Sequence, residues 1–145
     1  GYTYGCNGVW NWIDRKTKQA TFDSAMKRPT ATQMKYLHEF FNAIPWWTLE
    51  PAHELVRNQA DEWLSKMVAA KSAAGDLAVA YLPNNTEITV DMQAFPAGMT
   101  AQWFNPATGT YEAVTGSIPA TGSHTFRRPE SCDDVLLLLT ALRSP

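Results

Sequence analysis

The sequence has no strong excess of charge of either sign. Its 145 residues carry 12 Lys plus Arg against 14 Asp plus Glu, which gives a formal net charge of −2 at pH 7. Proteins that hold nucleic acid by its phosphates present a basic stripe or patch. No such stripe runs along this chain, so the sequence predicts no nucleic-acid partner.

Long hydrophobic runs are also missing. The longest runs, Leu77 to Leu82 and Val135 to Leu139, are far shorter than the roughly 20 residues that a membrane helix needs. The first residues, Gly1 to Gly5, lack the basic start and the apolar stretch of a signal peptide. They also lack an initiator Met. We therefore expect no membrane span, and we expect the chain to be a piece of a longer protein.

Cysteine and histidine are scarce and scattered. Cys6 and Cys132 match no zinc or thioredoxin motif. They could form one long-range disulfide if their Cα atoms came within about 7 Å, and two separate, partly buried thiols are the alternative. His38, His53 and His124 do not have the spacing of metal ligands. The sequence therefore predicts no metal and no cofactor.

The spacing of apolar residues differs between the first and the second part of the chain. From about Thr30 to Ala43, apolar residues recur every three or four positions, as the buried face of a helix requires, and Pro45 stops this helix. The face consists of Met34, Leu37, Phe40, Phe41 and Ile44. The sequence also predicts a short amphipathic turn around Trp10 and a polar loop over residues 14–28.

From about Glu54 onward, apolar residues alternate with a period of two, which is typical of strands with one buried face. About seven short strands recur roughly every 10 residues without helices between them, which indicates an antiparallel β-sandwich. The predicted strands are 67–70, 77–82, 86–90, 100–104, 110–114, 123–126 and 134–139. Pro106 and Gly109 predict a hairpin turn. We expect a mainly β chain, with one or two helices in residues 1–53 and a sandwich in residues 54–145.

Catalytic candidates are few. Glycosidases use two carboxylates, one of them in apolar surroundings that raise its pKa. Glu50, beside Trp46 and Trp47, is the only carboxylate whose neighbours suggest such a setting, and a surface or loop-capping role is the alternative. No G-x-S-x-G motif occurs, and neither cysteine stands in a protease-like context. The sequence therefore predicts no catalytic residue.

Aromatic residues are the most suggestive side chains for binding. Sugars stack their C–H-rich faces on aromatic rings, and Trp46–Trp47, Trp103–Phe104 and Tyr111 could form such a platform. In an alternating strand, however, one of Trp103 and Phe104 must face the core. The alternative for all of them is ordinary packing.

Four motifs follow one another along the chain. They are Gly1–Trp10 (G-x-TYG-x-x-x-x-W), Met34–Pro51 (a helix, then Pro-Trp-Trp-x-Leu-x-Pro), Ala78–Pro83 (close to A-x-V-Y-L-P) and Trp103–Gly109 (W-F-(D/N)-P-x-T-G). In this order they resemble segments of the apiosidase-like glycoside hydrolases, family 140 and its relatives. Many carbohydrate-active β-domains share the hairpin motif, whereas the four motifs together are specific.

The resemblance implies an enzyme whose (β/α)8 barrel leads into a C-terminal antiparallel sandwich similar to a domain named for collagen binding. The catalytic carboxylates of such barrels come from strand ends earlier in the chain, so it implies a barrel partner not present in this sequence. Tyr4, Asn7 and Trp10 would line the substrate cleft at the rim of the last barrel strand. Cys6 departs from the family's pattern at this rim.

We therefore predict that this chain is the non-catalytic C-terminal portion of a bacterial glycoside hydrolase, secreted or periplasmic, that degrades plant or other polysaccharide. It would brace the barrel and help to hold glycan. The alternative is a free-standing carbohydrate-binding module, with collagen as a minor alternative ligand. The predicted substrate-binding residues are Tyr4, Asn7, Trp10, Trp46, Trp47 and Trp103.

Overall fold

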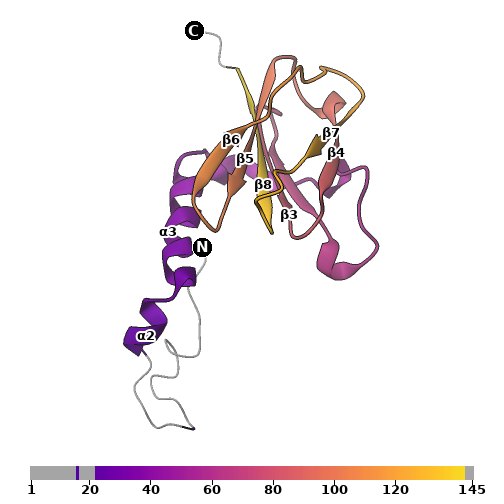
Figure 1. Cartoon of the computed structure of the whole chain (residues 1–145). Coiled ribbons are helices and arrows are strands. Elements are labelled where there is room, and N and C mark those ends of the chain that lie inside the picture. Colours follow the sequence, from indigo (N-terminus) through magenta and orange to yellow (C-terminus); the bar gives the residue numbers. More distant parts are fainter. Residues whose placement is uncertain (1–15, 17–21, 143–145) are drawn as a thin grey trace. The chain divides into compact units, whose positions relative to one another are not determined.

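The computed structural model describes residue 16 and residues 22–142. The chain forms two compact units: Gly1–Ile44 with Ala107–Gly109, and Pro45–Pro106 with Thr110–Pro145. The helices α2 (Phe22–Met26) and α3 (Pro29–Asn42) belong to the first unit, and the strands belong to the second (Figure 1).

Helix α3 confirms the predicted helix. Pro29 occupies its first turn, where the missing N–H has no intrahelical partner to lose. The N–H of Ala43 closes the last turn by donating to the carbonyl oxygen of Glu39 at 3.1 Å. The prediction of a loop over residues 14–28 was wrong at helix α2, because a helix of five residues is too short to show a helical period. The negative charge of Asp23, in its first turn, interacts favourably with the positive end of the helix dipole. The turn predicted around Trp10 lies outside the described residues.

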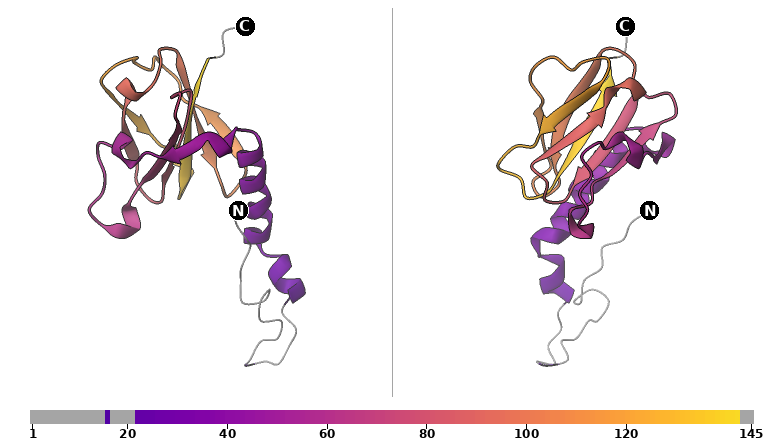
Figure 2. Two further views of the ribbon diagram at one scale, coloured as in Figure 1. Left: turned by 180° about the vertical axis from the view of Figure 1, so that it is seen from behind. Right: turned by 90° about the vertical axis from the view of Figure 1, so that its right-hand side faces the viewer.

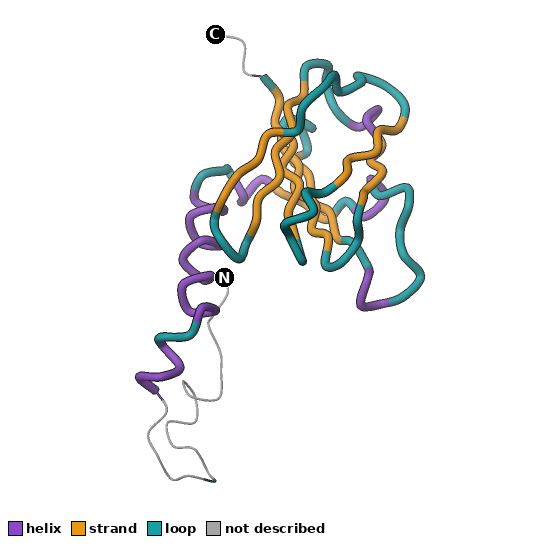
Figure 3. The backbone as a smooth tube through the Cα atoms, in the orientation of Figure 1, coloured by secondary structure: helices purple, strands orange, loops and turns teal. Residues whose placement is uncertain are grey.

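The described residues form eight strands in two antiparallel sheets (Figures 1 and 3). The larger sheet has the order β1-β2-β3-β8-β5-β6, and the smaller sheet pairs β4 with β7. The bounds are β1 (Leu49–Pro51), β2 (Val68–Ser72), β3 (Leu77–Leu82), β4 (Glu87–Asp91), β5 (Met99–Asn105), β6 (Thr110–Ala113), β7 (Ser123–Arg127) and β8 (Val135–Ala141). The predicted mainly β, antiparallel fold with a preceding helix is confirmed. The seven predicted strands are β2 to β8, and β1 is an additional edge strand.

Strand β8 is central to the larger sheet. It pairs along its length with β3 on one side and β5 on the other, with Leu137 opposite both Ala80 and Trp103. Residues Val135–Leu139 are all buried. Burial on both faces explains why this strand is a continuous apolar run instead of an alternating pattern.

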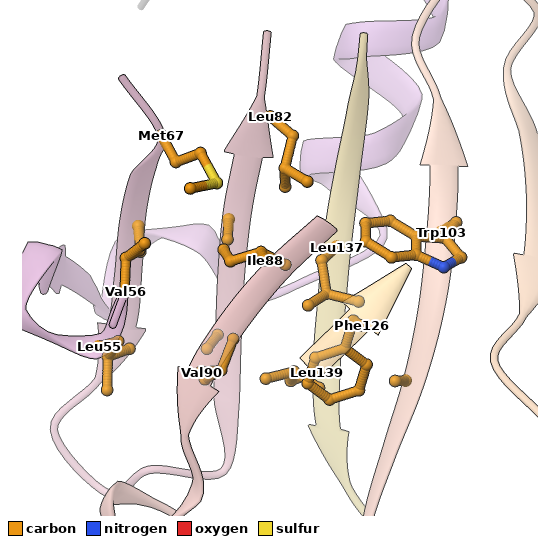
Figure 4. Close-up of a cluster of buried hydrophobic side chains, with 14 of the residues drawn as sticks. Leu55, Val56, Met67, Leu82, Ile88, Val90, Trp103, Phe126, Leu137 and Leu139 are labelled. Atoms are coloured by element: carbon orange, nitrogen blue, oxygen red, sulfur yellow. The ribbon is translucent and has the colours of Figure 1, made fainter. Parts of the chain in front are cut away.

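The two sheets form separate layers (Figure 2), and a hydrophobic core fills the space between them (Figure 4). Ile88 and Val90 of β4 and Phe126 of β7 contribute from the smaller sheet, and Trp103 and Leu137 contribute from the larger one. The void found within this core measures about 10 Å³, no more than one water molecule requires. The sandwich is therefore densely packed.

The hairpin between β5 and β6 follows its predicted chemistry. Asn105 and Thr110 are partners at the end of the ladder, and residues 106–109 make the turn. Gly109 has φ +75°, a left-handed conformation that side chains with a Cβ rarely adopt. This glycine thus ends the turn that Pro106 begins, as the sequence predicts.

A tyrosine–carboxylate hydrogen bond ties β3 to the start of β8. The hydroxyl of Tyr81 donates to Oδ2 of Asp134 at 3.0 Å. Burial, this hydrogen bond and the carboxylate charge raise the pKa of Tyr81 from 10.0 to about 12. The folded state thus holds the phenolic proton more tightly than the unfolded chain does, and the resulting stability is complete below pH 10.

We expect this stability to be lost as the pH rises from 10 to about 12. Thermal unfolding at pH 8 to 12 should show a steeper fall in melting temperature for the native chain than for Tyr81→Phe, which lacks the titrating hydroxyl. Parallel curves for the two proteins would contradict the prediction.

Candidate functional site

Two of the predicted binding residues lie side by side on a short 3-10 helix, η1 (Trp46–Thr48). Trp46 is 49% exposed and Trp47 is 71% exposed. Their ring centroids lie 6.3 Å apart with an interplanar angle of 79°. Because the two indoles are nearly perpendicular, they do not form one flat platform, and only one ring at a time could stack on a given sugar face.

Trp103 has a different environment from the one that stacking on a sugar requires. It is 4% exposed and belongs to the core of the sandwich, and Figure 4 shows its indole directed toward Leu137. Its neighbour Phe104 is 2% exposed, and its ring lies 4.9 Å from that of Tyr111. The alternation of a strand required one of Trp103 and Phe104 to face the core, and in the structure both side chains are buried. Trp103 therefore has no exposed indole face on which a sugar could stack.

The remaining predicted residues add little to a site. Tyr4, Asn7, Trp10 and Cys6 lie outside the described residues. Cys132 is a buried free thiol, and its sulfur accepts a hydrogen bond from Nδ2 of Asn105 at 3.3 Å.

Two further absences concern the part of the chain that the structure describes. It contains no cluster of three or more His, Cys, Asp or Glu residues that could hold a metal ion. None of its helices is both long enough and apolar enough to cross a membrane.

The sandwich carries a polar groove that the sequence did not indicate. It is a wide surface depression, open to solvent, with a volume of about 620 Å³. Two segments supply the side chains, one between β1 and β2 and the other running from the β3–β4 connection into the first residue of β4. The lining residues are Asn58, Ala60, Asp61, Glu62, Ser65, Asn84, Asn85, Thr86 and Glu87. We call this feature the polar groove.

Hydrogen bonds hold the first wall of the polar groove. The Gln59 side chain bridges the base of this loop: its Oε1 accepts from the N–H of Met67 at 2.8 Å, and its Nε2 donates to the Met67 carbonyl at 2.7 Å. Asn58 fastens the loop to β4, since its Oδ1 accepts from the N–H of Thr89 at 2.7 Å. The loop is thus fixed at its base and along its side.

The groove carries negative charge. Asp61 and Glu62 form no ion pair with any described residue, whereas Glu87 lies 3.5 Å from Nε of the well-exposed Arg127. Nearby, the Arg57 guanidinium pairs with Asp91 and, with the N–H of Gln93, holds the pKa of that carboxyl below its usual value. The charge of Arg57 is thereby engaged outside the groove, and the lining keeps two uncompensated carboxylates.

An exposed aromatic side chain stands beside these carboxylates. Trp63 and Leu64 belong to the 3-10 helix η3 (Trp63–Ser65) and are 78% and 60% exposed. Their neighbours Glu62 and Ser65 line the groove. The sequence signal was an acid–acid–aromatic run, Asp61-Glu62-Trp63, within a segment too short and irregular to show any period.

Comparison with protein families gives two matches that follow each other along the chain. A family model described as "Putative collagen-binding domain of a collagenase" matches residues 51–140, which is more than half of the chain. The chain belongs to this family. A second model, "Apiosidase-like, catalytic domain", matches residues 1–48. The two matches confirm the resemblance to the C-terminal part of apiosidase-like glycoside hydrolases. The sandwich of this chain is therefore a glycoside hydrolase-related domain.

Solved structures share the fold of this family member. One titled "Glycoside hydrolase" has a TM-score of 0.82 at 23% identity, over 97% of this chain and 33% of its own. A glycoside hydrolase family 5 structure from Bacteroides vulgatus has a TM-score of 0.82 at 20% identity, over 97% of this chain and 32% of its own. The chain thus spans about a third of the length of these structures. No curated protein matches it in sequence.

Proposed function

We propose that this chain is the non-catalytic C-terminal portion of a glycoside hydrolase that acts on plant or other polysaccharide, and that it braces the catalytic barrel. The observation that carries the proposal is the order of the two family matches, catalytic domain at 1–48 and sandwich at 51–140. A (β/α)8 barrel typically takes about 250 residues, with its catalytic groups at strand ends. A match of 48 residues cannot supply those strands, so the reaction belongs to the rest of the barrel.

The exposure of the tryptophan pair supports bracing. Trp46 and Trp47 lie at the end of the catalytic-domain match, where the chain enters the sandwich. Large aromatic side chains are favoured at protein interfaces, where their apolar surface is removed from water. In the enzyme, we expect a barrel to cover this pair.

A domain fusion tests the proposal. The chain alone should not hydrolyse aryl glycosides or plant polysaccharides. When it replaces the C-terminal part of an apiosidase-like enzyme, iodide should quench Trp46 and Trp47 less than in the chain alone. Trp47→Ser should lower the melting temperature of the fusion but not that of the chain. Turnover by the chain alone, abolished in Glu50→Gln, would overturn the proposal, as would equal quenching in both proteins.

A free-standing carbohydrate-binding module is the second candidate, favoured by the exposed tryptophans. Collagen, the ligand in the printed name of the family, is a minor alternative. Retention on a polysaccharide without any effect in the fusion would favour the module, and co-sedimentation with fibrillar collagen would favour the other ligand. For either function on external polymers, we propose a bacterial protein that is secreted or periplasmic.

A further inference from the structure

We propose that the polar groove binds a neutral, hydroxyl-rich oligosaccharide, with Trp63 stacking on a sugar ring at its border. All the residues involved belong to the second compact unit. The site therefore does not depend on whether the chain braces a barrel, and it is separate from the Trp46–Trp47 pair.

The lining has the hydrogen-bonding groups that a polyol requires. Ionised Asp61 and Glu62 accept hydrogen bonds only, and a sugar supplies hydroxyl donors, often from two adjacent carbons. The side-chain amides of Asn84 and Asn85 offer both donors and acceptors. This mixture suits hydroxyl groups, which donate and accept at once.

Asn85 has hydrogen-bonding capacity that the described residues leave unused. Its Oδ1 is buried and accepts no hydrogen bond, a state that is unfavourable for a polar atom removed from water. Because Asn85 lines the groove, a ligand hydroxyl that reached this oxygen and donated to it would satisfy it.

Trp63 supplies the apolar component. Its indole is 78% exposed and carries negative charge density on its face, which attracts the weakly positive C–H bonds on one side of a pyranose ring. A lone exposed tryptophan is unremarkable. The occurrence of this indole directly after Asp61 and Glu62, two carboxylates that line the groove, is what favours a sugar over an apolar ligand.

The charge of the groove selects among polysaccharides. Asp61 and Glu62 would repel the carboxylates of a uronic acid polymer, because like charges across an interface are costly. They do not affect a neutral chain in this way.

The wall of the groove is organised before any ligand binds. The Gln59 bridge to Met67 and the Asn58 bond to Thr89 fix the loop that bears Asp61, Glu62 and Trp63. A preformed loop avoids the entropic cost of ordering upon binding. Weak contacts with hydroxyl groups can then give measurable affinity.

Affinity gel electrophoresis of the full 145-residue chain tests this site. The gels would contain galactomannan, xylan, hydroxyethyl cellulose or polygalacturonate. We expect at least one of the three neutral polymers to retard the chain and polygalacturonate not to. Trp63→Ala should weaken that retardation about tenfold or more, equivalent to about 1.4 kcal/mol. The double variant Asp61→Asn/Glu62→Gln should weaken it as well.

Leu142→Ala is the control, because it removes another exposed apolar side chain of the same unit and should leave retardation unchanged. Far-UV circular dichroism would show that each exposed-site variant is folded. The proposal would be wrong if no neutral polymer retarded the chain, if Trp63→Ala bound normally, or if only polygalacturonate bound. Binding of oligolysine in place of any glycan would identify a peptide site instead. None of these results affects the fusion test of bracing.

Discussion

Replacing Trp103 with alanine is expected to lower the free energy of unfolding by about 3–5 kcal/mol. Trp103 is 4% exposed and lies between β6 and β8, with Glu112 opposite it on one side and Leu137 on the other. Its removal would leave a cavity in the shared core that the flanking strands cannot fill. Urea unfolding followed by far-UV circular dichroism would measure the change, which is a large part of the roughly 5–15 kcal/mol of a typical domain.

The comparison with Trp103→Phe separates packing from sugar binding. Phenylalanine retains most of the apolar volume, so this variant should lose much less stability and bind glycan as the native chain does. Trp47→Ala, at an exposed position, should change the free energy of unfolding by no more than about 0.5 kcal/mol. A stable Trp103→Ala variant that had lost glycan binding would instead place Trp103 in a binding site.

Phe126→Ala is expected to have an effect of similar size, about 3–5 kcal/mol, for a different structural reason. Phe126 is 1% exposed and comes from β7, one strand of the two-stranded sheet. Two paired strands are marginally stable on their own in water. The smaller sheet therefore depends on the apolar side chains that it places against the larger one, and Phe126 is the largest of them.

A neighbouring substitution provides the control for Phe126. Thr125 points away from the core and shares a hydroxyl hydrogen bond of 2.8 Å with Thr89. Thr125→Ala should therefore cost only about 1 kcal/mol. Hydrogen exchange of Phe126→Ala should show that the amides of β4 and β7 lose protection before those of β8. Uniform loss of protection over both sheets would mean that the smaller sheet does not unfold separately.

The strands were predictable because burial on one face of a sheet gives alternating apolar residues and burial on both faces gives a continuous apolar run. Alternation identified β4, and a continuous apolar run identified β8, which is buried on both faces. Strand β1 was not predictable: it has three residues and includes Pro51. Proline suits an edge strand, since it cannot donate to a ladder, but a segment this short shows no period.

The candidate site was predictable only in part, because the type of a residue does not determine whether its side chain is exposed in the folded protein. In the sequence, Trp46, Trp47 and Trp103 were equally good candidates for sugar stacking. In the structure, the indoles of Trp46 and Trp47 are exposed, whereas that of Trp103 is buried in the core. Trp63 went unnoticed because its importance comes from the groove beside it. That groove is assembled from two segments, 58–65 and 84–87, that 18 residues separate in the sequence, and no local pattern indicates that they meet.

The central position of β8 has a consequence for how the protein is made. Strands β3 and β5 have no pairing with each other and are joined only through β8, the last of the described strands in chain order. During synthesis, the two halves of the larger sheet must wait until residues 135–141 have left the ribosome. Contacts between distant residues form slowly, and unpaired strands are prone to aggregate in the meantime. Nascent chains stalled before Val135 should therefore be protease-sensitive, and they should become resistant once β8 emerges.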